Sequence, residues 1–343
     1  MITQGSTYLD LKKVTKALTF RMPEKQGPWV STKTPLGQSN PTFILHGNNE
    51  KLVLRKKPFG KLLKSAHMVE REYQVMSALA KTDVPVPEMY YLCEDAIEIG
   101  TPYFVMEYVD GQSFVDPRIT QISVSDRKVV YEETVKGLAS LHKVDPDIVG
   151  LSHFGKPGNY FSRQFSRWSG QYEASKTDKI LPMEILMEWL SDHVPEEEGA
   201  ARLVHGDWRI DNLLFHKENF ELIAILDWEL STLGDPRADL ASQIMQWSMP
   251  VGEEGRGLAG VNRQDLGIPE DNEFLEKYSQ YIGLPDIPDL EFPIAFCYFR
   301  MGAILQGVKK RALDGNASNP EKAIKMGEYV SEFARKALER LKI

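Results

Sequence analysis

The first third of the chain alternates between helix-like and strand-like hydrophobic patterns. Apolar side chains recur on one helical face over residues 9–18, which predicts an amphipathic leading helix. Helical spacing returns over residues 66–80 and stops at Asp83, just before two prolines. Short apolar runs rich in β-branched and aromatic residues predict two strand pairs, the first joined by a Gly/Asn-rich turn. These four strands are expected at 42–45, 51–54, near 90–93 and near 103–107.

Beyond Asp110-Gly111 the pattern becomes mainly helical. Ser125-Asp126 predicts the N-cap of a helix that runs through Leu141. Further helices are expected at 184–193 and 292–310, and one strand pair at 212–215 and 222–227. A β-rich part followed by a larger helical part predicts an α+β two-lobe fold. We place the small β-rich N-lobe at 1–108 and the larger, mainly helical C-lobe at 109–343.

Composition and charge narrow the class of protein. The 343 residues are 42% hydrophobic and 26% charged, which is ordinary for a globular protein, and the formal net charge is -8. The acidic balance argues against binding to nucleic acid. The most apolar stretch, 292–308, carries Arg300 near its middle and predicts a buried helix rather than a membrane span. The N-terminus has no apolar leader and the two cysteines match no metal or redox spacing. We therefore expect a cytoplasmic protein, with import into an organelle left open.

The strongest chemical pattern lies between His205 and Phe215. Asp207 and Asn212 stand five residues apart on a loop that leads into a predicted strand, and the paired strand ends in Asp227. Phosphoryl transfer needs a carboxylate near the acceptor hydroxyl and oxygen ligands for metal ions that bridge the phosphates. The pattern predicts Asp207 as the catalytic carboxylate and Asn212 with Asp227 as metal ligands.

This block resembles the catalytic loop and metal-binding Asp of the aminoglycoside phosphotransferase-like branch of the protein-kinase superfamily. The segment from Gly234 to Ala241 is similar to the next signature of that family, in which Asp239 opens a helix and anchors the catalytic loop. The resemblance implies ATP and Mg²⁺ as cofactors and a protein-kinase-like two-lobe fold. It also implies that adenine binds the backbone carbonyl of Glu107 and the backbone N–H of Val109, where the lobes join.

The phosphate-binding positions depart from the protein-kinase pattern. Arg55 stands where kinases carry a strand lysine, and we expect it to pair with Glu72, while Lys56 and Lys57 stay open as alternatives. Glu70 is the fallback partner. The loop that covers the phosphates holds one glycine, and Ser39 in it is expected to contact phosphate oxygens.

The acceptor is expected to be a small hydroxylated molecule. Only 12 residues separate Asp227 from Asp239, which leaves no room for the activation segment of a protein kinase. Arg209 is predicted to neutralise charge on the transferring phosphate, or alternatively to pair with Asp211. The runs at 54–58, 65–67 and 70–73 look most like the kinase-like domain fused to some acyl-CoA dehydrogenases. That resemblance implies a hydroxyacyl-CoA acceptor, with Lys61 and Lys64 near its anionic groups. An aminoglycoside-type antibiotic kinase and a nucleotide-binding pseudokinase scaffold remain the alternatives.

Overall fold

The computed structural model describes residues 9–25, 27–34, 40–59, 67–156, 158–196, 201–252, 255–315 and 319–343. The chain divides into two compact units, each built from several segments. The first unit comprises Met1–Val115, Ile122–Ser152 and Arg209–Ser231, and the second comprises Asp116–Gln121, His153–Trp208 and Thr232–Ile343. The lobe boundary near residue 108 stays a prediction.

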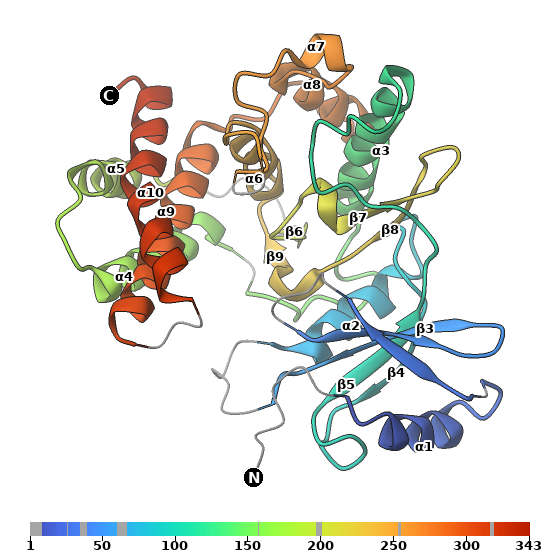
Figure 1. The fold of residues 1–343 in the computed structure, drawn as a ribbon. Helices are drawn as coiled ribbons and strands as arrows, with labels where there is room; N and C mark the ends of the chain where they lie inside the picture. Colours follow the sequence, from blue (N-terminus) through green and yellow to red (C-terminus); the bar gives the residue numbers. More distant parts are fainter. Residues whose placement is uncertain are drawn as a thin grey trace. The chain divides into compact units, whose positions relative to one another are not determined.

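The first unit contains an antiparallel five-stranded sheet in the order β1-β2-β3-β5-β4 (Figure 1). The strands are β1 Val30–Lys33, β2 Thr42–His46, β3 Lys51–Lys56, β4 Met89–Cys93 and β5 Tyr103–Glu107. The predicted hairpin and the second strand pair are therefore confirmed, while β1 was not predicted. In the register of the sheet Arg55 stands between Thr42 of β2 and Phe104 of β5.

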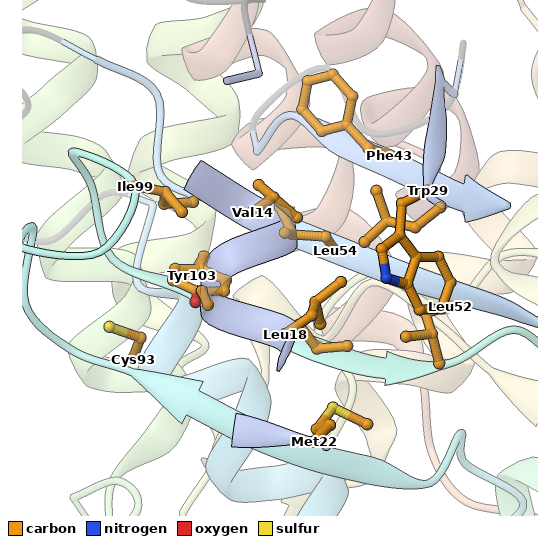
Figure 2. Packing of buried hydrophobic residues seen from close by; sticks show 13 residues of the cluster. Val14, Leu18, Met22, Trp29, Phe43, Leu52, Leu54, Cys93, Ile99 and Tyr103 are labelled. Carbon is orange, nitrogen blue, oxygen red and sulfur yellow. The ribbon is translucent and has the colours of Figure 1, made fainter. Parts of the chain in front are cut away.

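The predicted leading helix is confirmed as α1, Leu11–Arg21, and its apolar side packs against this sheet. Figure 2 shows Val14 and Leu18 of α1 facing Leu54 and Trp29 in a cluster of buried side chains. Gly47, in the β2–β3 turn, lies so close to Trp29 that an added Cβ would come within 2.9 Å of the indole ring. The turn glycine therefore makes room for this core.

Strand alternation decides which side chains of β3 face which layer. Leu52 and Leu54 join the α1 cluster, so Arg55 points to the opposite face, toward α2 (Val69–Leu79). Burial on α2 falls at helical spacing and includes Glu72, Val75 and Leu79 along with the apolar Val69 and Met76. The packing of α2 against the sheet thus places the carboxylate of Glu72 next to Arg55 of β3.

The remaining elements of the first unit are α3, Val124–Lys143, and the hairpin of β7, Leu213–Phe215, with β8, Leu222–Ile225. The predicted N-cap of α3 was wrong by two residues. Ser123, not Ser125, accepts the backbone N–H of Asp126, because the first helical backbone bond already runs from the N–H of Arg127 to the carbonyl of Ser123.

The second unit is mainly helical (Figure 1). A two-stranded sheet pairs β6, Arg202–Val204, with β9, Thr232–Gly234. Its helices are α4 Tyr160–Ser175, α5 Leu181–Asp192, α6 Arg237–Trp247, α7 Arg263–Leu266, α8 Asp271–Ile282, α9 Glu291–Leu313 and α10 Pro320–Leu341. The helices predicted at 184–193 and 292–310 are confirmed as α5 and α9. Within the described ranges, no helix is both long and apolar enough to cross a bilayer.

Candidate active site

The segment His205–Trp208, in the second unit, leaves β6 as a tightly held loop. The carboxylate of Asp239, in the first turn of α6, accepts the backbone N–H of His205 at 2.7 Å and that of Gly206 at 2.8 Å. Asp239 is fully buried, and these two bonds to backbone N–H groups offset the cost of burying its charge. The anchoring role expected for Asp239 is therefore seen directly in the structure.

The backbone conformation of this loop explains why position 206 is a glycine. Gly206 has φ +82°, in the left-handed region that an L side chain rarely adopts. The turn is followed by Asp207, whose backbone N–H lies 3.3 Å from Nδ1 of the buried His205. The side chain of Asp207 stays half-buried, in contrast to the fully buried Trp208 that follows it. The loop thus holds the predicted catalytic carboxylate on a fixed backbone, and its role stays a prediction.

The two predicted metal ligands lie at the end of the β7–β8 hairpin in the first unit. Asn212 ends a short 3-10 turn, Ile210–Asn212, and its carbonyl accepts the backbone N–H of Leu226 at 2.8 Å. This bond extends the hairpin by one step, so Asp227 directly follows the residue that is paired with Asn212. Asp227 has φ +65°, an uncommon conformation for a residue other than glycine. Strained backbone of this kind is concentrated at functional sites.

The donor set fits Mg²⁺. Asn212 and Asp227 offer one amide oxygen and one carboxylate, and Mg²⁺ is commonly held by one or two protein oxygens together with substrate phosphates and water. No group of three or more His, Cys, Asp or Glu side chains suited to a metal occurs in the described part of the chain. The metal-binding role of Asn212 and Asp227 stays a prediction.

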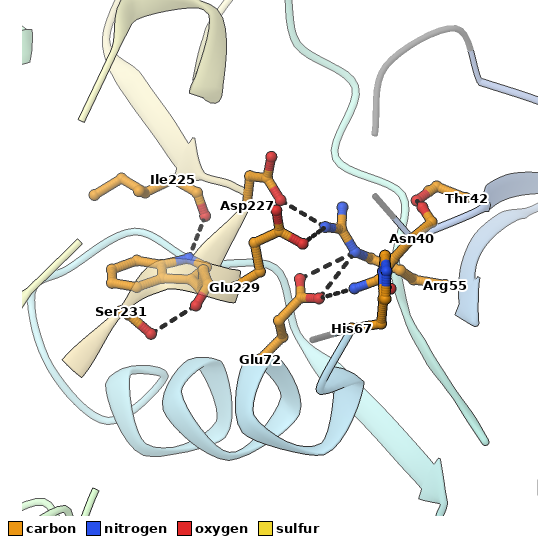
Figure 3. A network of polar contacts seen from close by, with 10 residues as sticks. Asn40, Thr42, Arg55, His67, Glu72, Ile225, Asp227, Glu229 and Ser231 are labelled. Atoms are coloured by element: carbon orange, nitrogen blue, oxygen red, sulfur yellow. Dashed lines mark hydrogen bonds and ion pairs between the residues drawn. The ribbon is translucent and has the colours of Figure 1, made fainter. Parts of the chain in front are cut away.

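Arg55 joins α2 to this hairpin (Figure 3). Its Nε lies 3.0 Å from Oε2 of Glu72, and its Nη2 donates to Oδ1 of Asp227 at 2.5 Å. Glu229 approaches the same Nη2 at 3.9 Å. The side chains of Arg55 and Glu72 are only 9% and 1% exposed, so this ion pair is shielded from water. The pairing of Arg55 with Glu72 that the sequence predicted is present, and Asp227 extends it.

Burial shapes the charges of this network. Burial alone would lower the pKa of Arg55. The negative charges of Glu72 and Asp227 have the larger effect, so the pKa of Arg55 lies above its ordinary value. Burial also raises the pKa of Glu72 to about 7, against the attraction of Arg55. The guanidinium of Arg55 therefore stays charged, with Glu72 on one side and Asp227 on the other.

The two neighbouring lysines point elsewhere. Lys56 is fully buried on the other face of β3, its Nζ 3.9 Å from the centre of the Phe59 ring, and burial lowers its pKa to about 8. Lys57 pairs with Glu70 at 2.8 Å. Among these three cations, Arg55 is the one that the structure joins to Glu72 and Asp227.

Arg209 forms the alternative pair considered from the sequence. Its Nε and Nη2 donate to the two carboxylate oxygens of Asp211 at 3.0 and 2.5 Å. Asp211 is buried, whereas the Arg209 side chain is 30% exposed. The pair fixes the direction of the guanidinium, and contact with a phosphate stays a prediction.

The predicted adenine-binding segment leaves the end of β5. Glu107 and Val109 are half-buried, and the Val109 carbonyl accepts the backbone N–H of Gly111 at 3.1 Å. Ser39, Lys61 and Lys64 lie outside the described residues. The assignments of Ser39, Glu107 and Val109 to the nucleotide stay predictions.

Three residues of the site region carried no assignment from the sequence. Asn40 is fully buried and donates to Glu72 at 2.8 Å, and Glu229 approaches Arg55. Arg300 of α9 is half-buried and lies within electrostatic range of Asp207. Of the three, only Arg300 could have been noticed from the sequence. A charged residue in the middle of an apolar helix is costly to bury unless it interacts with a polar or charged group.

Comparison of the chain with known proteins finds a family and several relatives. The profile described as the phosphotransferase enzyme family matches residues 32–275. A Mus musculus protein named acyl-CoA dehydrogenase family member 10 is 44% identical over 313 residues, which cover 90% of this chain and 29% of that protein. The probable acyl-CoA dehydrogenase IBR3 of Arabidopsis thaliana is 42% identical over 321 residues, 88% of this chain and 39% of that protein. The chain therefore spans well under half the length of these relatives.

Solved structures agree on the fold. A provisionally assigned aminoglycoside phosphotransferase from Ralstonia eutropha is 40% identical, with a TM-score of 0.87 over 98% of this chain and 99% of that one. A ternary complex of the aminoglycoside phosphotransferase APH(4)-Ia with ADP and hygromycin B has a TM-score of 0.61 at 13% identity, over 96% of this chain and 98% of that one. At that identity the likeness concerns the fold alone.

Proposed function

The chain belongs to the phosphotransferase enzyme family, and on that premise we propose that it moves the γ-phosphoryl group of ATP to a hydroxyl of a small anionic molecule, with hydroxyacyl-CoA as the leading candidate. The observation that carries the proposal is the joining of Arg55 to Glu72 and Asp227 beside Asn212. A cation beside two oxygen ligands is what binding of a nucleoside triphosphate with its metal ion requires, and this supports the proposal.

The chain's own residues divide the work of the transfer. Asp207 accepts the proton of the acceptor hydroxyl as its oxygen forms a bond to the γ-phosphorus and the bond to the ADP oxygen breaks. Asn212 and Asp227 would hold Mg²⁺, which neutralises charge between the phosphates when bound. Arg55 binds phosphate oxygens, and Glu107 and Val109 bind adenine through their backbones. Ser39 adds a phosphate contact.

The basic test of this function does not depend on the natural acceptor. We expect the purified chain to release ADP from ATP only when Mg²⁺ and a suitable hydroxylated compound are both present. A panel of hydroxyacyl-CoA thioesters, neutral polyols and kanamycin-type aminoglycosides, read by ADP release and product mass, identifies the acceptor class. Tight ATP binding with no acceptor-dependent turnover over the whole panel would instead identify a pseudokinase scaffold.

An anionic acceptor is supported by Arg300. Burial acts to lower the pKa of this arginine, but Cys297, Tyr160, Asp207 and Asp239 outweigh it and raise the pKa. Among the described residues none forms an ion pair with Arg300, and Asp239 already accepts two backbone N–H groups. A half-buried guanidinium near Asp207 is therefore available to a carboxylate or phosphate of the acceptor.

A cationic acceptor is the second candidate. An open groove along α4 and α5 is lined by four carboxylates, those of Glu173, Glu184, Glu188 and Asp192. A polycationic aminoglycoside is attracted to such a surface. Lys176 pairs with both Glu173 and Glu184, at 2.9 and 2.7 Å, and reduces the negative charge of the groove. The acceptor panel separates the two candidates.

Replacing Arg300 by Gln is expected to raise the KM for an anionic acceptor roughly 10–100-fold, because a hydrogen bond to a charged group is lost. The KM for ATP and the turnover of a neutral alcohol should change little. Arg311→Gln is the matched control, since Arg311 is an exposed arginine on the same helix. An equal loss on neutral and anionic acceptors would show that Arg300 supports the fold rather than the acceptor.

Replacing Arg209 by Ala is expected to lower kcat by about 10-fold or more while the KM for ATP changes little, since its charge would act on the transferring phosphate. Asp211→Asn is the informative comparison, because it keeps the cation but weakens the salt bridge. If both variants lose the same activity, Arg209 acts only by pairing with Asp211.

A further inference from the structure

A buried asparagine adjoins the polar network around Arg55, on the side of Glu72 away from Asp227 (Figure 3). Asn40 precedes β2 and is fully buried. Its Nδ2 donates to Oε1 of Glu72 at 2.8 Å, and its Oδ1 lies 3.2 Å from Nδ1 of His67. Both ends of the amide are therefore occupied, which is what a fully buried amide requires.

The bond to Glu72 constrains the carboxylate from a second side. Oε1 of Glu72 accepts from Nε of Arg55 at 3.1 Å as well as from Asn40. With a donor on either side, the carboxylate is held in one orientation, and the Nε of Arg55 is held with it. The Nη2 of the same guanidinium is then directed toward Asp227.

We propose that Asn40 is a positioning residue for nucleotide phosphates: its amide fixes Glu72, and Glu72 in turn directs Arg55. The inference rests on the proposed function, because it takes Arg55 as the phosphate-binding cation. An apolar residue at position 40 would leave Oε1 of Glu72 with one donor fewer in a buried setting. An aspartate there would place a second carboxylate against it.

Equilibrium binding tests the inference without any knowledge of the acceptor. Asn40→Ala is expected to weaken Mg-ATP binding roughly 10-fold by calorimetry, the lower end of the 10–100-fold effect that supporting residues have at metal sites. Binding of adenosine, which has no phosphates, should stay within about twofold, because the Asn40 effect is transmitted only through Arg55. Asn40→Ser serves as a milder second variant if Asn40→Ala does not fold.

Two controls separate positioning from a general loss of structure. Thr42→Val removes a buried hydroxyl that donates to the backbone carbonyl of Asn40 at 3.1 Å, and it should leave Mg-ATP affinity within about twofold. In a Glu72→Ala background, substitution of Asn40 should have almost no further effect on Mg-ATP affinity.

Three results overturn the inference. They are unchanged Mg-ATP affinity in a folded Asn40 variant, an equal loss of adenosine and ATP affinity, and full additivity with Glu72→Ala. Absence of Mg-ATP binding by the wild-type chain would instead reject the proposed function, so the two failures are distinguishable.

Discussion

Replacing Asp207 by Asn is expected to lower phosphotransfer turnover by on the order of 10²–10⁴-fold while Mg-ATP binding stays near normal. The substitution keeps the volume of the side chain and removes the carboxylate that accepts the hydroxyl proton. The loop around it should keep its shape, because Asp239 holds it through the backbone N–H groups of His205 and Gly206. Steady-state ADP release and calorimetry with Mg-ATP measure the two effects separately.

A matched control for this variant is Asp235→Asn. Asp235 also lies in the second unit, but its carboxylate accepts three hydrogen bonds from the side chain of Arg237. Because this pair is largely buried, loss of the carboxylate should lower stability, whereas turnover of the folded enzyme should stay within a few-fold of the wild type. Near-normal turnover of the Asp207→Asn enzyme on its true acceptor would remove Asp207 from the catalytic role.

The second large effect is expected for Asp227. Replacing it by Asn should weaken Mg²⁺-dependent ATP binding by at least about 100-fold, since even residues that only support metal ligands contribute 10–100-fold. Asparagine tolerates the left-handed backbone conformation at this position, so the loss reports the missing charge rather than strain. ATP binding measured in EDTA should change little, because the carboxylate acts through the metal.

Glu229→Gln is the matched control for Asp227→Asn. Glu229 lies two residues further along and also faces Arg55, but at 3.9 Å and outside the predicted ligand pair. Its variant should retain most of the Mg²⁺-dependent affinity. If Asp227→Asn binds Mg-ATP as tightly as the wild type, the ligand assignment is wrong, and the bond to Arg55 is then the main role of Asp227.

Local sequence pattern by itself determines much of the fold. The β2–β3 hairpin, the β4–β5 pair and the helices α1, α2, α5 and α9 follow from hydrophobic spacing and turn residues, which act over a few neighbours in the chain. Helix α10 was not predicted. Small residues, including Ala323, Ala334 and Ala337, form much of its buried face, yet the buried positions recur at helical spacing, so the pattern for this helix was present in the sequence.

The candidate chemistry was also visible in the sequence, because it is concentrated in short motifs. Asp207, Asn212 and Asp227 belong to one loop-and-hairpin segment, so their spacing alone predicted an oxygen-rich site. The bonds from Asp239 to the loop were expected from the family resemblance, and the structure shows them. The pairs of Arg55 with Glu72 and of Arg209 with Asp211 were also considered from the sequence, but the contact of Arg55 with Asp227 and the surroundings of Asn40 and Arg300 were not.

The tertiary structure decided those contacts. Arg55 and Asp227 stand 172 residues apart and meet because β3, α2 and the β7–β8 hairpin belong to one unit. Asn40 gains its importance only because the fold buries it against Glu72, and Arg300 only because α9 places it near Asp207. Sequence periodicity determines which face of an element is buried, whereas the packing of distant elements determines which polar groups meet on that face.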